Sequence, residues 1–91
     1  MTHKEHCAEC REKLGKDWAV VHKWLDHYAA QTFPSDRHRI HRHNLDGVEE
    51  CRKRWGNEAA KAAELHILSD VKAYGMDHIP NMAEAEKLWA Q

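Results

Sequence analysis

The sequence predicts an all-α protein, a small bundle of four to five helices with short connections, and three observations support this. Apolar residues recur at steps of three and four along most of the chain, which is the period of a helix that faces a core. Glycine and proline interrupt this pattern at Gly15, Pro34, Gly56 and Gly75. No segment shows the alternation of apolar and polar residues that is typical of a strand.

The first two helices are predicted from their capping residues. Thr2 and Glu5 have the spacing of a capping box, which indicates a helix over residues 3–14 that stops at Gly15. Asp17 is placed to cap a second helix that reaches to about residue 32. The apolar stripe of that second helix consists of Trp18, Val21, Leu25 and Tyr28.

Three further helices are expected in the second half. Pro34 disfavours a helical residue before it, so the third helix is expected over residues 37–55, with Gly56 ending it. Asn57 is expected to cap a fourth helix that runs to residue 74. Asn81 and Glu84 again have capping-box spacing and open a short last helix.

Length and composition bound the class of protein. The 91 residues make one domain, 1–91, and the hydrophobic share of 42% with a charged share of 32% indicates a folded globular chain. No apolar run approaches the ~20 residues that span a bilayer, and the N-terminus lacks the apolar region of a signal peptide. Three cysteines, an odd number, fit a reducing compartment. We therefore expect a cytoplasmic protein without a membrane partner.

Two histidine–aspartate pairs share one spacing. His22 and Asp26 are four residues apart, as are His66 and Asp70, so each pair lies on one face of its predicted helix. Each pair also borders the apolar stripe of its helix and can point into the seam between helices, where bundles build metal sites. The alternative is an ordinary hydrogen bond on the helix surface.

The segment "SDRHRIHRHN", residues 35–44, can add ligands from the predicted third helix. His38 and either His41 or His43 could face the bundle near the start of that helix. The alternative is a solvated basic turn. The complete predicted metal site consists of His22, His38, His43 and His66, with Asp26 and Asp70 as ligands or as acceptors for the ligating histidines.

Nitrogen and oxygen ligands of this kind suit Zn, Ni, Fe or Mn. Among the histidines, His22 and His38 are the first choices as ligands. The lowest-ranked histidines are His3, His27, His41 and His78.

The N-terminal Cys7-x-x-Cys10 has the spacing of half a zinc finger. A second ligand pair is missing, because only Cys51 remains and it falls on an apolar stripe. No phosphate-binding glycine loop, H-E-x-x-H or G-x-S-x-G occurs, so the enzyme classes that carry these motifs lose support. Whether the protein is an enzyme is left open.

The order of these residues resembles a family of short uncharacterised bacterial and phage-borne proteins. The family pattern is His-x-Trp-Leu-Asp, then Arg-His-Arg, a later His and a Gly. The matching positions here are His22, Trp24, Leu25, Asp26, Arg37, His38, Arg39, His43 and Gly47, and His6 fits an early family histidine. Asn44 stands where the pattern has a second histidine. The family has no assigned activity, so the resemblance implies which residues matter and no reaction.

Three functions are consistent with the sequence. The first is a small helical protein that holds a transition metal between helices, with or without catalysis by metal-activated water. The second is a non-catalytic adaptor or homo-oligomer, because four tryptophans on a thin core could form an interface. The third is nucleic-acid binding through a basic third helix, which the net charge of −1 argues against. The sequence does not identify a small-molecule substrate.

Overall fold

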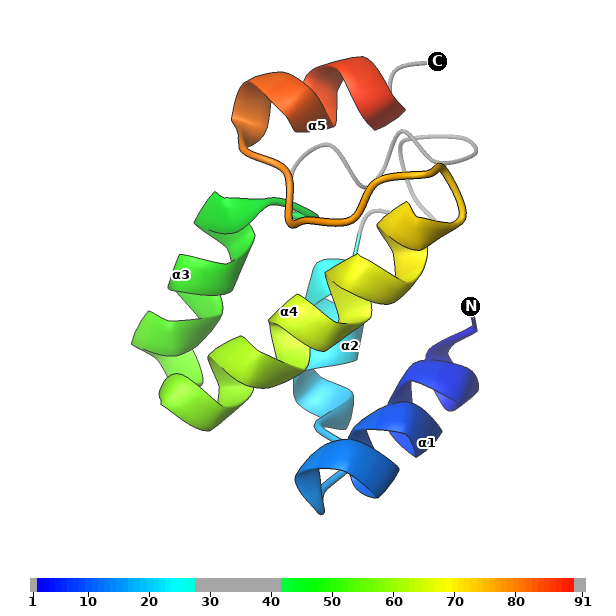
Figure 1. Cartoon of the computed structure of the whole chain (residues 1–91). Coiled ribbons are helices and arrows are strands. Elements are labelled where there is room, and N and C mark those ends of the chain that lie inside the picture. The colour runs from blue at the N-terminus through cyan, green and yellow to red at the C-terminus, as the bar shows by residue number, and fades with distance from the viewer. Residues whose placement is uncertain (1, 28–41, 90–91) are drawn as a thin grey trace.

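The structure, a computed structural model, describes residues 2–27 and 42–89, and five helices lie within these ranges (Figure 1). They are α1 (His3–Leu14), α2 (Ala19–Leu25), α3 (Leu45–Trp55), α4 (Asn57–Lys72) and α5 (Met82–Trp89). The described residues form no strand, so the all-α prediction is confirmed. The predicted helical residues 28–32 and 37–41 lie outside the described ranges.

The longest helix, α4, is the centre of the bundle. It contacts α3 most extensively and also packs against α2 and α1, and Figure 1 shows it between α3 on one side and α1 with α2 on the other. Its buried residues include four alanines, which let neighbouring helices approach closely, followed by Ile67 and Val71. None of the helices in the described residues has the length and apolar character needed to cross a membrane.

Two capping boxes form as the sequence predicts. The Thr2 hydroxyl accepts from the Glu5 backbone N–H, and the Glu5 carboxylate accepts from the Thr2 backbone N–H. Asn81 and Glu84 exchange the same pair of hydrogen bonds at the start of α5. Gly15 ends α1 with a left-handed φ of 79°. These caps fix the ends of α1 and α5 from local sequence alone.

The second helix is shorter than predicted. Trp18 precedes it with a left-handed φ of 55°, so α2 begins only at Ala19, whose backbone N–H donates to the Asp17 carboxylate at 3.2 Å. At its other end α2 stops at Leu25, and Asp26 is the C-terminal cap residue. The expectation that the helix continues through residues 26 and 27 is wrong.

The third helix begins at Leu45, and the expectation of helix over residues 42–44 is wrong. Asn44 has extended backbone angles, and its side chain accepts from the Gly47 backbone N–H at 2.9 Å, which makes Asn44 the N-cap. A Cβ at Gly47 would collide with the carbonyl oxygen of Arg42. The guanidinium of Arg42 donates to the Trp24 carbonyl at 2.7 Å, which holds this turn against the end of α2.

The junction of α3 and α4 is also displaced by one residue from its prediction. Gly56, with φ of 98°, ends α3 and is itself the N-cap of α4. Asn57 is the first residue of α4, and its side chain accepts from Nε of Arg52 instead of capping the helix. The left-handed backbone favours glycine at this position.

Candidate metal centre

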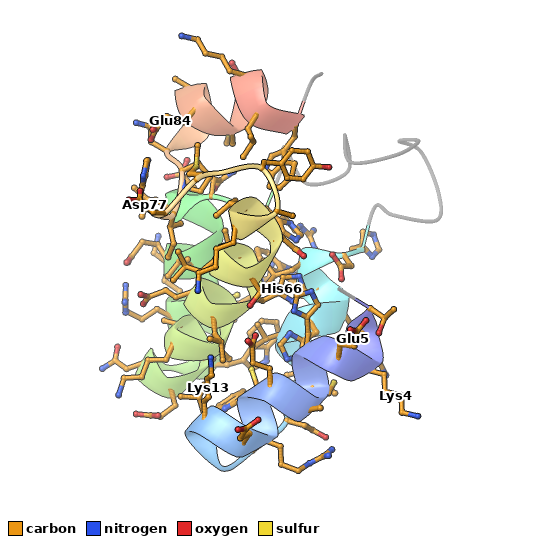
Figure 2. All side chains as sticks on the ribbon, turned by 45° about the vertical axis from the view of Figure 1, so that its right-hand side comes forward. Lys4, Glu5, Lys13, His66, Asp77 and Glu84 are labelled. Carbon is orange, nitrogen blue, oxygen red and sulfur yellow. The ribbon has the colours of Figure 1, made fainter. Side chains whose placement is uncertain are left out.

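Four histidines and two aspartates converge between α1, α2 and α4, and we call them the His–Asp cluster. His6 comes from α1 and His22 from α2, Asp26 caps α2, His43 lies in the turn before α3, and His66 and Asp70 lie on α4. Figure 2 labels His66 on the side of α4 that faces α1 and α2. Five of the six residues, all except His6, belong to the site predicted from the sequence. They come from positions up to 48 residues apart in the chain.

The cluster lies in the interior of the protein, and only one of its residues is exposed to solvent. Both members of the α4 pair are buried, with 0% of His66 and 3% of Asp70 exposed. The alternative of a surface hydrogen bond is therefore wrong for this pair. His6, His22 and His43 are equally buried, whereas the side chain of Asp26 is 30% exposed. Asp26 is thus the edge at which the cluster reaches solvent.

Two imidazole nitrogens and two carboxylates meet at the centre of the cluster. Nε2 of His43 and Nε2 of His66 lie 3.1 Å apart. Asp26 Oδ1 lies 3.4 Å from the first nitrogen and 3.6 Å from the second. Asp70 Oδ2 lies 3.2 Å and 3.4 Å from the same two nitrogens. Each carboxylate therefore contacts both imidazoles.

Three of these separations, at 3.4–3.6 Å, match the spacing of ligands around one metal ion, and the other two, at 3.1 and 3.2 Å, are slightly shorter. Ligand atoms at about 2.0–2.2 Å from a tetrahedral zinc ion lie about 3.3–3.6 Å from one another. Direct charge-assisted hydrogen bonds are shorter, at about 2.7–2.9 Å. The rings of His43 and His66 are inclined at 63°, so their in-plane lone pairs can meet at one point. Asp26, His43 and His66 accordingly form one group of side chains able to hold a metal ion.

A hydrogen-bond chain behind the centre determines which nitrogen of His66 carries its proton. Nε2 of His22 lies 2.9 Å from the Asp17 carbonyl oxygen, which can only accept, so this nitrogen donates. Burial is the main cause that lowers the pKa of His22 to about 4, so the ring is neutral and its Nδ1 accepts. Nδ1 of His66, 2.8 Å away, must then donate. Nε2 of a neutral His66 then carries a lone pair, which can accept from Nε2 of His43, 3.1 Å away.

Both aspartates stay ionised. Burial alone would raise the pKa of Asp70, but the neighbouring imidazoles of His43, His6 and His66 outweigh it and hold the pKa below its ordinary value. The pKa of Asp26 is lowered in the same way, with burial opposed by His43 and His66. The centre therefore concentrates negative charge in a low-dielectric interior, where charges are paired or coordinate metals.

One comparison with known proteins identifies the family of this chain. A family model described as a domain of unknown function, DUF6915, matches residues 1–85. The chain belongs to the DUF6915 family. The match contains all six residues of the His–Asp cluster and confirms the expectation of an uncharacterised domain family. No curated protein and no solved structure matches the chain.

The sequence-based site of this DUF6915 member omitted His6. Its ring is 1% exposed and stacks on His66 with the ring centroids 3.6 Å apart, and its Nε2 lies 3.4 Å from Asp70 Oδ1. The resemblance to an early family histidine was the one signal that marked it. Helical periodicity could not identify His6, because α1 carries no long apolar stripe that would show which of its faces is buried.

The remaining histidine candidates are exposed or lie outside the described ranges, and the ring of His3 approaches His22 edge-on with the centroids 6.0 Å apart. His38 and His41 fall within residues 28–41. His3 and His27 are exposed, and His78 is bound to Asp77 and Glu84 at the surface. Within residues 2–27 and 42–89, no group of side chains able to hold a metal includes a cysteine. Cys7 and Cys10 are buried in α1 as free thiols.

Proposed function

We propose that this protein binds a divalent transition metal between its helices, with His43, His66, Asp26 and Asp70 as the ligands. The observation that carries the proposal is that a carboxylate oxygen of each aspartate lies close to the same two imidazole nitrogens. Nε2 of His43 and Nε2 of His66 are 3.1 Å apart, and a carboxylate oxygen of each aspartate lies within 3.6 Å of both. A divalent cation there would neutralise the two carboxylates.

His22 was predicted to be a metal ligand because of its spacing to Asp26. In this proposal it does not bind the metal directly. Both of its ring nitrogens are engaged, one with the Asp17 carbonyl and the other with His66. His22 therefore orients a ligand and fixes its tautomer, as the outer partners of metal-bound histidines do. His38, beyond the described residues, stays a predicted ligand.

Two nitrogen and two oxygen ligands favour Zn, Ni, Fe or Mn over softer metals. Asp26 stands at the exposed edge of the cluster, so exchange of its carboxylate for water would open one position on the metal. A metal held by these residues would supply Lewis acidity and would lower the pKa of water for a hydrolytic reaction. A hydrolytic reaction is the activity that this centre would support best.

The nucleic-acid alternative is weakened by the pairing of the α3 arginines. Arg52 contacts the Glu49 carboxylate, and Arg54 donates to Glu50 at 3.0 Å, so the helix face carries compensated charge. The alternative of a homo-oligomer without metal gives no role to the two ionised carboxylates that contact the same two imidazole nitrogens.

Elemental analysis of protein purified without a histidine tag or a nickel column tests the proposal. After reconstitution with Zn or Mn and desalting, the protein should retain stoichiometric metal. His66→Gln should lose it, and the surface control His78→Gln should retain it. Wild-type protein that retains no metal, and gains no thermal stability from either ion, would overturn the proposal.

A further inference from the structure

His6 and Asp70 carry the further inference. Asp70 turns its two carboxylate oxygens to different partners: Oδ2 to Nε2 of His43 and His66, and Oδ1 to Nε2 of His6 at 3.4 Å. That last separation is again too long for a charge-assisted hydrogen bond. Nδ1 of His6 is buried, and within the described residues it has no hydrogen-bond partner. The metal centre proposed above uses neither His6 nor Oδ1.

His6 cannot join the metal that His66 binds. The two rings are stacked, with an interplanar angle of 15° and ring centroids 3.6 Å apart. An imidazole binds a metal in its own plane, and two nearly parallel planes do not meet close to the rings. Although His6, His66 and Asp70 are near enough to form a metal-holding group, ring orientation rules out one ion shared by both histidines.

The same stacking places a second ion at a suitable distance from the first. Each ion would lie in the plane of its own histidine, so the two ions would be separated by about the spacing of the rings. Two-metal sites have their ions about 3.5–4 Å apart. A single carboxylate contacts Nε2 of both stacked rings, one oxygen to each, as a bridging carboxylate does.

We propose that His6 Nε2 and Asp70 Oδ1 form a second divalent-metal position, bridged to the first by Asp70. This rests on the proposed metal-binding function and extends it to a dinuclear centre. The second ion has only two protein ligands within the described residues, so solvent or substrate completes its coordination. It therefore binds more weakly than the first, and it prefers ions such as Mn or Fe that accept mixed nitrogen and oxygen ligands.

Manganese titration of the metal-free protein tests the inference. Bound metal is counted by equilibrium dialysis, and the bound state is examined by electron paramagnetic resonance at low temperature. Wild-type protein should bind two ions per chain and show the multiline spectrum of a coupled pair. His6→Gln should bind one ion and show an uncoupled Mn spectrum. His78→Gln, at the surface and away from the cluster, should behave as wild type.

The possible failures are distinguishable. One ion per chain in both wild type and His6→Gln, without a coupled signal, would overturn the second position and leave the first intact. Weaker binding of that one ion in His6→Gln would mean that His6 only positions Asp70, and it also overturns the second position. No binding by wild type would overturn the metal-binding function itself. The wild-type spectrum gives this answer even if His6→Gln does not fold.

Discussion

Nδ1 of His22 and Nδ1 of His66 lie 2.8 Å apart between α2 and α4, and this hydrogen bond leaves the other nitrogen of His66 facing the two aspartates. The Asp17 carbonyl fixes the direction of the donors along the chain. A neutral histidine can donate from one nitrogen and accept at the other. The residues just before and within α2 thereby determine which atom of α4 is available to a metal.

The first prediction concerns His22 as an orienting residue. His22→Gln should weaken metal binding by roughly 10–100-fold without changing the number of ions bound, because the outer partner of a ligating histidine is lost. Competition against a chromogenic chelator measures the change. His27→Gln is the control, since this histidine is exposed near the end of the same helix. Complete loss of metal in His22→Gln would instead identify His22 as a ligand.

The two aspartates should differ in their effects on metal affinity. Asp70→Asn should cause the larger loss, because this carboxylate is 3% exposed and water cannot replace it easily. Asp26→Asn should cause a smaller loss, because its side chain is 30% exposed and solvent can take its place. Asp77→Asn, at the surface beside His78, is the control. Equal losses for Asp26 and Asp70 would contradict the assignment of Asp26 to an open edge.

The third prediction concerns pH. The pKa of His22 is lowered to about 4 by burial and by His66, whereas an unfolded histidine titrates near pH 6.5. Between these values the unfolded chain binds more protons than the folded chain, so the free energy of unfolding falls as the pH falls. The lowered pKa values of Asp26 and Asp70 extend this loss to more acidic solutions.

Urea unfolding of the metal-free protein between about pH 7 and pH 5 measures this dependence. Wild type should lose stability across the interval, and His22→Gln should show a smaller slope. In metal-loaded protein the slope should be steeper, because protons also compete with the metal for its ligands. A flat profile in both forms would exclude buried neutral histidines at this site.

The fourth prediction concerns Gly47. Glycine to alanine inside a helix usually stabilises, but a Cβ here would collide with the Arg42 carbonyl oxygen, next to His43. Gly47→Ala should destabilise the protein by about 1–3 kcal/mol and also weaken metal binding. Asp46→Ala, at an exposed position of the same turn, is the control for thermal unfolding. A Gly47→Ala variant as stable as wild type would show that the turn tolerates displacement.

The features that sequence predicted well are those with local causes. The capping boxes Thr2–Glu5 and Asn81–Glu84 involve residues three apart, and both form. His66 and Asp70 lie on one buried face of α4, as their spacing of four predicts. The predicted start of the third helix is wrong over residues 42–44, because Asn44 caps α3 and its side chain accepts from the Gly47 backbone N–H.

The features that sequence missed depend on tertiary packing. His22 and Asp26 share the spacing of His66 and Asp70, yet α2 ends at Leu25 and the two side chains contact opposite nitrogens of His66. His6 reaches the cluster only because α1 packs on α4, some 60 residues away in sequence. No local pattern encodes either contact, because both depend on how the helices cross.

The location of bound metal is the most direct test of the central claim. Crystals of protein reconstituted with Zn or Mn, measured at the absorption edge of that metal, should show an anomalous peak about 2.0–2.2 Å from Nε2 of both His43 and His66. Oxygens of Asp26 and Asp70 should complete the coordination. A metal peak elsewhere, such as beside His3 and Cys7, or no peak at the cluster in metal-loaded crystals, would contradict the account.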